Sequence, residues 1–99
     1  MSHRGSLLLL PSGIWAWPVN DPAGITAQTL APVIAESDRI GIVLIGTGHT
    51  RWPLPAELMQ LFAAHRISAE TSRTGQAANT YNILLEEGRR VAAALIAID

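Results

Sequence analysis

Eight apolar residues follow one another near the end of the chain, at positions 91–98 (VAAALIAI). A strand with one face in water alternates apolar and polar side chains, so a run without alternation predicts a strand covered on both faces. The run is too short to span a bilayer as a helix, which needs roughly 20 residues. We therefore expect residues 91–98 to form the central strand of a layered fold.

A helix is predicted directly before this strand. Apolar side chains recur there at helical spacing, at Ala77, Tyr81, Leu84 and Leu85. Thr74 is placed to cap the first turn, and Gly88 can adopt the left-handed conformation that ends many helices. The last third of the chain is therefore expected to be one helix followed by one buried strand.

The rest of the chain predicts alternating strands and helices. Strands are expected at 7–10, 14–17, 40–45 and 66–71. Helices are expected at 27–36, where Pro32 either starts or kinks the helix, and at 54–65. Strand–helix–strand units such as 40–71 are parallel. We expect one α/β domain over residues 1–99, in three layers, with a small mixed sheet and helices on both faces.

Few side chains of this chain are charged. Asp, Glu, Lys and Arg make up 15% of the 99 residues, against a usual quarter, and the net charge is -1. A surface so poor in charge predicts that a partner or a second copy covers part of it. The chain has no general attraction for phosphate backbones, so no nucleic-acid binding is expected.

Several kinds of enzyme chemistry are excluded because the chain lacks the residues that they require. All 7 basic residues are arginines and the chain has no cysteine, which excludes Schiff-base chemistry, the P-loop lysine, thiol catalysis and disulfides. His3, His49 and His65 lack the spacing of shared metal ligands, and no nucleophile signature accompanies them. We expect no metal and no cofactor, and the sequence identifies no catalytic residue. The four leucines at 7–10 are too few for a signal peptide, so a cytoplasmic location is expected.

Three segments resemble a known family: GSLLLLPSGIWAW at 5–17, IVLIGTG at 42–48 and TGQAANTYNILLEEGRRVAAALIAI at 74–98. They are similar to the small α/β domain family that includes the mitochondrial complex I assembly factor three, the adipogenesis-associated domain protein and uncharacterised bacterial and archaeal proteins. The resemblance implies a three-layer fold with the last strand central. It also implies a protein that is not an established enzyme, with a link to assembly of the respiratory NADH dehydrogenase.

This chain departs from the family pattern at two positions and near its start. Ser72 and Asn79 stand where the family often has methionine and arginine. The family also tends to carry a further strand ahead of the segment 3–10. Without that strand, one edge of the sheet would be exposed and could pair with another chain.

The turn Gly46-Thr47-Gly48 follows a predicted parallel strand, where open α/β sheets bind ligands. Two glycines let a backbone approach a ligand closely, and the free N–H groups at the start of a helix bind anions. The candidate ligand site comprises Gly46, Thr47, Gly48, Thr74, Asn79 and Tyr81. The alternative interpretation is structural: the glycines form a tight turn, Thr74 caps the helix, and Tyr81 packs in the core.

The candidate interface residues are Trp15, Trp17 and Trp52. Trp15 and Trp17 share one face of a predicted strand, and that face is either core or an interface anchor.

Two functions are consistent with these sequence features. We favour a non-catalytic interaction or assembly protein that self-associates and reaches a membrane only through a partner. The alternative is a small-ligand binding protein or enzyme that uses the Gly-Thr-Gly turn and the adjacent helix start.

Overall fold

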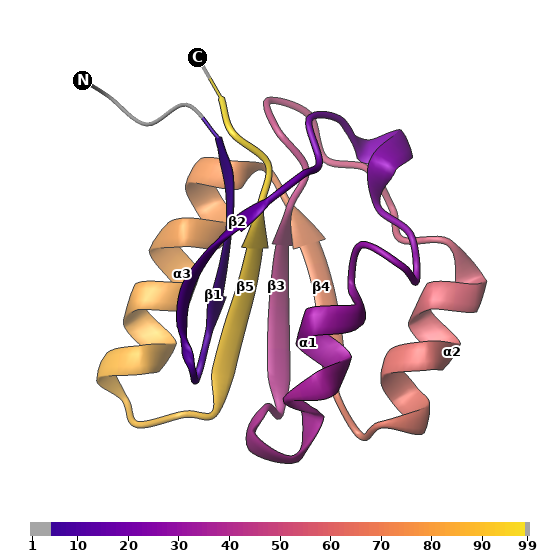
Figure 1. The fold of residues 1–99 in the computed structure, drawn as a ribbon. Helices are drawn as coiled ribbons and strands as arrows, with labels where there is room; N and C mark the ends of the chain where they lie inside the picture. The colour runs from indigo at the N-terminus through magenta and orange to yellow at the C-terminus, as the bar shows by residue number, and fades with distance from the viewer. Residues whose placement is uncertain (1–4, 99) are drawn as a thin grey trace.

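The computed structural model describes residues 5–98 and contains a five-stranded mixed sheet with three α-helices (Figure 1). The strands are β1 (Ser6–Leu10), β2 (Gly13–Trp17), β3 (Ile42–Gly46), β4 (Ser68–Ser72) and β5 (Val91–Leu95). The helices are α1 (Ala31–Ala35), α2 (Ala56–Ala64) and α3 (Thr74–Glu86), with short 3-10 helices at Pro22–Gly24 and Ser37–Arg39. The prediction of an α/β fold with a mixed sheet is confirmed.

Strand β5 lies in the middle of the sheet, whose order is β2-β1-β5-β3-β4. It pairs antiparallel with β1 and parallel with β3. Ala92, Ala93 and Ala94 are fully buried, so both faces of this strand are covered, as the apolar run predicts. The strand ends at Leu95, earlier than expected, and Ile98 is 45% exposed.

Helices cover both faces of the sheet, which gives the three layers expected. On one face α1 and α2 pack Val33, Leu58 and Phe62 into a large core that also contains Val43 and Ile45 of β3. On the other face α3 contributes to a smaller cluster, whose buried members are Leu44, Ala77, Val91 and Ala93. The half-buried residues around it are Leu9, Ile42, Tyr81, Leu84 and Leu95. Successive side chains of β3 and β5 serve opposite faces because a strand alternates them.

Several other predicted boundaries differ from the observed ones: β3, expected from residue 40, begins at Ile42, and α2, expected from residue 54, begins at Ala56. Of the two alternatives for the helix expected at 27–36, a start near Pro32 is confirmed, since α1 begins at Ala31. Before it, Thr26 and Thr29 form a local turn in which the Thr26 N–H donates to Thr29 Oγ1 at 2.8 Å. The strand expected from residue 66 begins at Ser68, because Arg66 has φ 61° in the left-handed region and closes α2. A residue with positive φ interrupts regular structure, and local side-chain hydrogen bonds such as that of Thr29 compete with a helix.

Helix α3 has the expected extent, but its first turn is not capped as predicted. Arg73 occupies the N-cap position and no side chain caps the turn. Gly88 has φ 75° and follows the helix end, as expected. Leu85, predicted to share the apolar face, is 51% exposed. Within residues 5–98, every helix is too short or too polar to cross a membrane.

Candidate functional site

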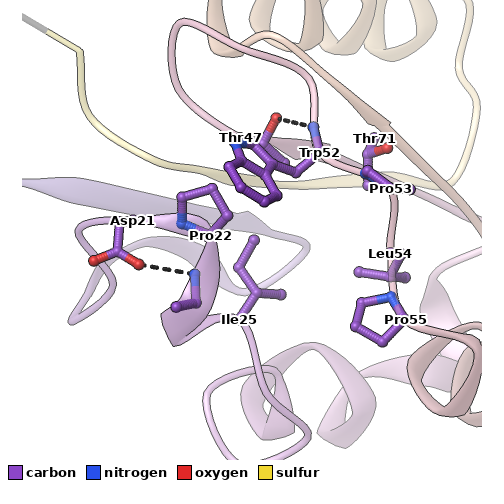
Figure 2. A pocket seen from close by; sticks show the side chains of 10 residues that line it. Asp21, Pro22, Ile25, Thr47, Trp52, Pro53, Leu54, Pro55 and Thr71 are labelled. Carbon is purple, nitrogen blue, oxygen red and sulfur yellow. Dashed lines mark hydrogen bonds between the residues drawn. The ribbon is translucent and has the colours of Figure 1, made fainter.

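The carboxyl end of β3 leads into a loop that is held by one buried hydroxyl group. Thr47 is only 3% exposed, and its Oγ1 lies 2.7 Å from the Thr50 carbonyl oxygen and 3.1 Å from that of Ser72. The same oxygen accepts a hydrogen bond from the Trp52 backbone N–H at 3.1 Å (Figure 2). Thr47 therefore fixes the path of the chain from β3 to Trp52 and leaves its hydroxyl proton committed to the backbone.

Trp52 stands over a hollow of about 410 Å³ beside the carboxyl ends of β3 and β4 (Figure 2). Its side chain is 54% exposed, so the indole ring forms one open wall. The lining residues are Asp21, Pro22, Ala23, Ile25, Thr47, Trp52, Pro53, Leu54, Pro55 and Thr71. Most of these side chains are apolar, and the prolines hold their backbone at fixed φ, so the walls suit an apolar occupant and are already formed.

Two further hollows adjoin the one under Trp52 and share walls with it. One, of about 440 Å³, shares Pro53, Leu54 and Thr71 and extends along β4. The other, of about 410 Å³, shares Ile25 and Pro55 and extends along α2. We call the three together the apolar groove.

The Gly-Thr-Gly turn and the start of α3 are in direct contact. The Gly48 N–H donates to Thr74 Oγ1 at 2.9 Å, and the Thr74 N–H donates to the Gly48 carbonyl at 2.9 Å. Thr74 Oγ1 in turn donates to the Ile96 carbonyl at 2.7 Å. Gly46 lies so close that a Cβ there would be 2.8 Å from Thr74 Cα. The structure thus brings together Gly46, Gly48 and Thr74, with no room for a ligand between Gly46 and the helix.

The outer side of this contact forms a small hollow of about 230 Å³, lined by Gly48, His49, Arg73, Gly75, Gln76 and Ile98. Asn79 is exposed on α3, and Tyr81 packs with the cluster under α3. Neither residue lines this hollow or the apolar groove. The six predicted ligand-site residues are therefore divided: Thr47 faces the groove, the glycines and Thr74 form the contact, and Asn79 and Tyr81 lie elsewhere.

The three tryptophans have three different environments. Trp17 is 3% exposed and its indole N–H donates to the Thr29 carbonyl at 2.8 Å, so it belongs to the core and offers no interface. Trp15 is 52% exposed on β2, a strand at the edge of the sheet. Trp52 alone opens onto the apolar groove.

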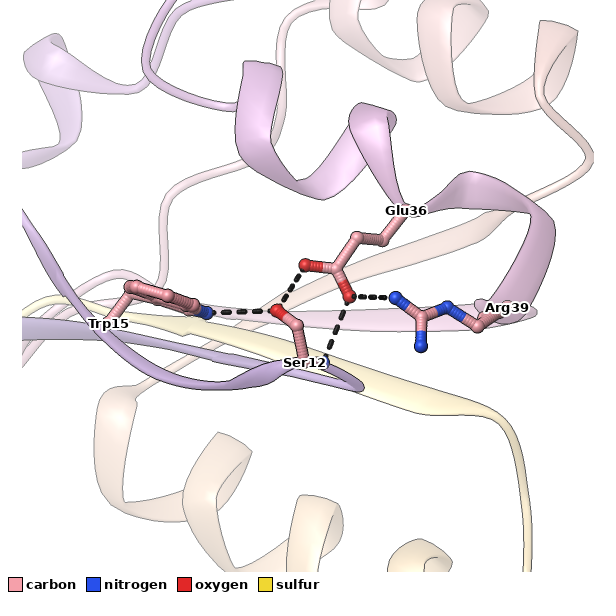
Figure 3. A network of polar contacts seen from close by, with 4 residues as sticks. All are labelled: Ser12, Trp15, Glu36 and Arg39. Atoms are coloured by element: carbon pink, nitrogen blue, oxygen red, sulfur yellow. Dashed lines mark hydrogen bonds and ion pairs between the residues drawn. The ribbon is translucent and has the colours of Figure 1, made fainter.

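A polar network holds Trp15 against the turn of its own hairpin (Figure 3). Trp15 Nε1 donates to Ser12 Oγ at 3.0 Å, and the Ser12 N–H donates to Glu36 Oε1 at 3.0 Å. Arg39 forms an ion pair with the same Glu36 oxygen at 3.1 Å. The network ties the β1–β2 turn to the end of α1, and exposed pairs of this kind add little stability.

The histidines are scattered. Within residues 5–98 no group of three His, Cys, Asp or Glu side chains could hold a metal ion. His49 is exposed beside the small hollow, and His65 Nδ1 lies 3.4 Å from Ser37 Oγ. His3 lies outside the described residues.

Sequence reasoning missed the wall of the groove that the segment 21–25 supplies. Asp21 accepts a hydrogen bond from the Ala23 N–H at 2.8 Å and so starts the short helix that brings Pro22 and Ile25 over the strand ends. The Asp-Pro pair was a visible signal of a helix start. Nothing in the local pattern indicated which part of the sheet this loop would cover.

Comparison with known proteins gives a consistent set of relatives. A family of proteins of unknown function, DUF498/DUF598, matches residues 1–96. The mouse NADH dehydrogenase [ubiquinone] 1 alpha subcomplex assembly factor 3 is 34% identical over 92 residues, which are 93% of this chain and 50% of that protein. An uncharacterised protein of Rhodobacter capsulatus is 36% identical over 94 residues, which are 95% of this chain and 70% of that protein. The chain thus spans about half the length of the assembly factors it matches.

Solved structures with the same fold come from several bacteria. A Bartonella henselae protein described as an outer membrane protein has TM-score 0.94 and 45% identity, covering 100% of this chain and 83% of that one. A Mth938-like domain protein of Bordetella pertussis has TM-score 0.82 and 30% identity, covering 94% of this chain and 73% of that one. With a family match across nearly all its residues and relatives that share both sequence and fold, this chain belongs to the DUF498/DUF598 family.

Proposed function

We propose that this chain is a non-catalytic, assembly-type interaction domain whose apolar groove holds a segment of a partner protein. The observation that carries the proposal is the half-exposed Trp52, which stands over preformed apolar walls at the carboxyl ends of β3 and β4. Tryptophans in such pockets contribute much of the binding energy of protein interfaces. The Thr47 hydroxyl beside it is engaged with backbone groups, which favours a structural role for it.

The relatives support a partner within the respiratory NADH dehydrogenase, because the mouse protein is an assembly factor for that enzyme. The proposal places the chain in the cytoplasm, where it would meet a membrane only through that partner. It includes self-association, because Ile14 is 71% exposed and Trp15 is 52% exposed along the edge strand β2. Apolar side chains on an open edge favour pairing with another chain.

A complementation experiment tests the assembly function. In Rhodobacter capsulatus lacking its 36% identical relative, we expect this chain to restore the amount of assembled NADH dehydrogenase on native gels. Trp52→Ala is expected to restore less than half as much, roughly the effect of losing one interface hot spot. Leu85→Ala is the matched control, because it removes a similarly exposed apolar side chain on α3, outside both the groove and the edge strand β2.

Two results would contradict the assembly proposal. One is a normal amount of the enzyme in the strain that lacks the relative. The other is full restoration by Trp52→Ala, provided that circular dichroism shows both variants to be folded.

The small hollow beside the start of α3 favours a second candidate function, the binding of a small anion. Arg73, the Gly48 backbone and the first turn of α3 line it, and the positive end of a helix attracts anions. If inorganic phosphate is the ligand, a concentration of 100 times its Kd should add about 2.7 kcal/mol to the free energy of unfolding. Thermal shift with phosphate, against chloride at equal ionic strength, measures this, and an unchanged melting temperature removes the candidate.

A further inference from the structure

The outer edge of β4 carries backbone groups that point away from the sheet. β4 is the last strand in the sheet order, and only β3 pairs with it among the described residues. The Ser68 N–H donates to the Gly41 carbonyl and the Ser72 carbonyl accepts from the Thr47 N–H, so these two residues face the β3 side. Because backbone groups alternate along a strand, those of Ala69 and Thr71 face outward.

Arg51 occupies part of this edge. Its Nε donates to the Thr71 carbonyl at 3.0 Å, which agrees with the outward direction of that carbonyl. Charged side chains often protect edge strands in this way. The hydrogen bond is exposed to solvent, so a competing backbone donor can replace it at small cost.

A hollow lies directly beside the same edge. It is one end of the apolar groove, and its lining residues are Arg51, Pro53, Leu54, Met59, Ala69, Glu70 and Thr71. Met59 is 45% exposed there, and methionine adapts its shape to different apolar partners. An extended segment paired with β4 would therefore place alternate side chains over an apolar surface.

The charges around the groove are unequal. Three acidic residues, Asp21, Glu57 and Glu70, are among those that line it, against one basic residue, Arg51. The whole chain has a net charge of only -1, so negative charge is concentrated here. Complementary charge selects partners and speeds their association.

We propose that the outer edge of β4 binds an extended segment of the partner protein, in which apolar residues alternate with lysine or arginine. The segment adds a sixth strand to the sheet, places apolar side chains in the groove beside Ala69 and directs the alternate basic ones to the opposite face, where Glu70 pairs with Leu44 of β3. Strand addition of this kind takes affinity from main-chain hydrogen bonds and specificity from side-chain pockets. The inference rests on the proposed function and names the chemistry of its partner. A second copy fits less well, because neither of its edge strands, β2 and β4, carries a basic residue.

Titration of the ¹⁵N-labelled chain with two synthetic peptides tests the inference. In one peptide valine alternates with lysine, and in the other valine alternates with glutamate. We expect the lysine peptide to bind at least about tenfold more tightly, with the largest amide shifts at Ala69, Glu70 and Thr71, and we expect the preference to shrink in high salt. The Trp52 indole signal should shift in the same titration.

Three variants sharpen this test. Arg51→Ala is expected to bind the lysine peptide more tightly, since it frees the Thr71 carbonyl and removes the one positive charge; damage to the fold would not produce a gain. Glu70→Gln is expected to weaken binding several-fold. Glu86→Gln, an exposed carboxylate at the end of α3, should leave the affinity unchanged.

Equal affinity for the two peptides, shifts confined to β2, or weaker binding by Arg51→Ala would overturn the inference. So would an absence of binding by both peptides. If the chain nevertheless restores NADH dehydrogenase assembly in the complementation strain, the assembly function stands and only the strand-addition mode is lost. If complementation fails as well, the proposed function is lost with it.

Discussion

Replacing Thr74 with valine is expected to lower the free energy of unfolding by about 2–4 kcal/mol. Valine has nearly the shape of threonine, so the change removes the hydroxyl and little else. That hydroxyl accepts from the Gly48 N–H and donates to the Ile96 carbonyl, and the side chain is 8% exposed. Buried groups left without partners cost roughly 1–3 kcal/mol each. Since Gly48 is only half-buried, water can reach its N–H and reduce the total loss of free energy of unfolding.

Thr80→Val is the matched control for Thr74→Val. Thr80 is half-buried on the same helix, and the helix propensities of threonine and valine are similar. We expect it to change the free energy of unfolding by less than about 0.5 kcal/mol. Urea denaturation followed by circular dichroism measures both. A loss below about 1 kcal/mol for Thr74→Val, or one equal to the control, would show that the hydroxyl does not hold this contact.

The role of Thr74 illustrates what local pattern reasoning can and cannot supply. A threonine at a predicted helix start suggests a cap, and the helix does begin there. The hydroxyl instead bonds to Ile96, 22 residues further along the chain, and to Gly48, 26 residues before it. Such partners are decided by how the sheet and α3 pack together, and the sequence around Thr74 carries no sign of them.

The sheet itself was far more predictable than the site. The run 91–98 lacks alternation, and its central residues are buried on both faces, because only a strand covered on both sides avoids exposing so much apolar surface. The parallel pairing of β3 and β4 followed from the helix between them. These features depend on residues near one another in the chain.

Trp15 and Trp17 show why surface residues were harder to predict. Both point to the same side of β2, opposite Leu8 and Ser6 of β1. Trp17 is buried because the segment that contains Thr29 folds over it, whereas Trp15 lies beyond this cover. The groove depends on the same kind of loop placement, since Asp21 and Ile25 come from a loop whose position the local pattern does not specify.

Replacing Gly46 with alanine is expected to cost about 3 kcal/mol, near the upper end of the usual range for overpacking. The added Cβ would lie 2.8 Å from Thr74 Cα, 3.0 Å from Thr74 Oγ1 and 3.1 Å from Leu95 Cδ2. The first of these is a backbone atom, so α3 itself must move away from β3. That movement would also strain the hydrogen bonds that join Gly48 to Thr74.

Gly41→Ala is the control, because it also replaces a glycine by alanine but at a position where the added Cβ has room. A Cβ at Gly41 would meet nothing nearer than the Arg90 carbonyl at 3.7 Å, an ordinary contact. We expect it to change the free energy of unfolding by less than about 1 kcal/mol in urea denaturation. A similar loss for both variants would mean that the cost at Gly46 does not arise from contact with α3. The start of α3 would then not be packed against β3, and Gly46 would not need to be glycine for that reason.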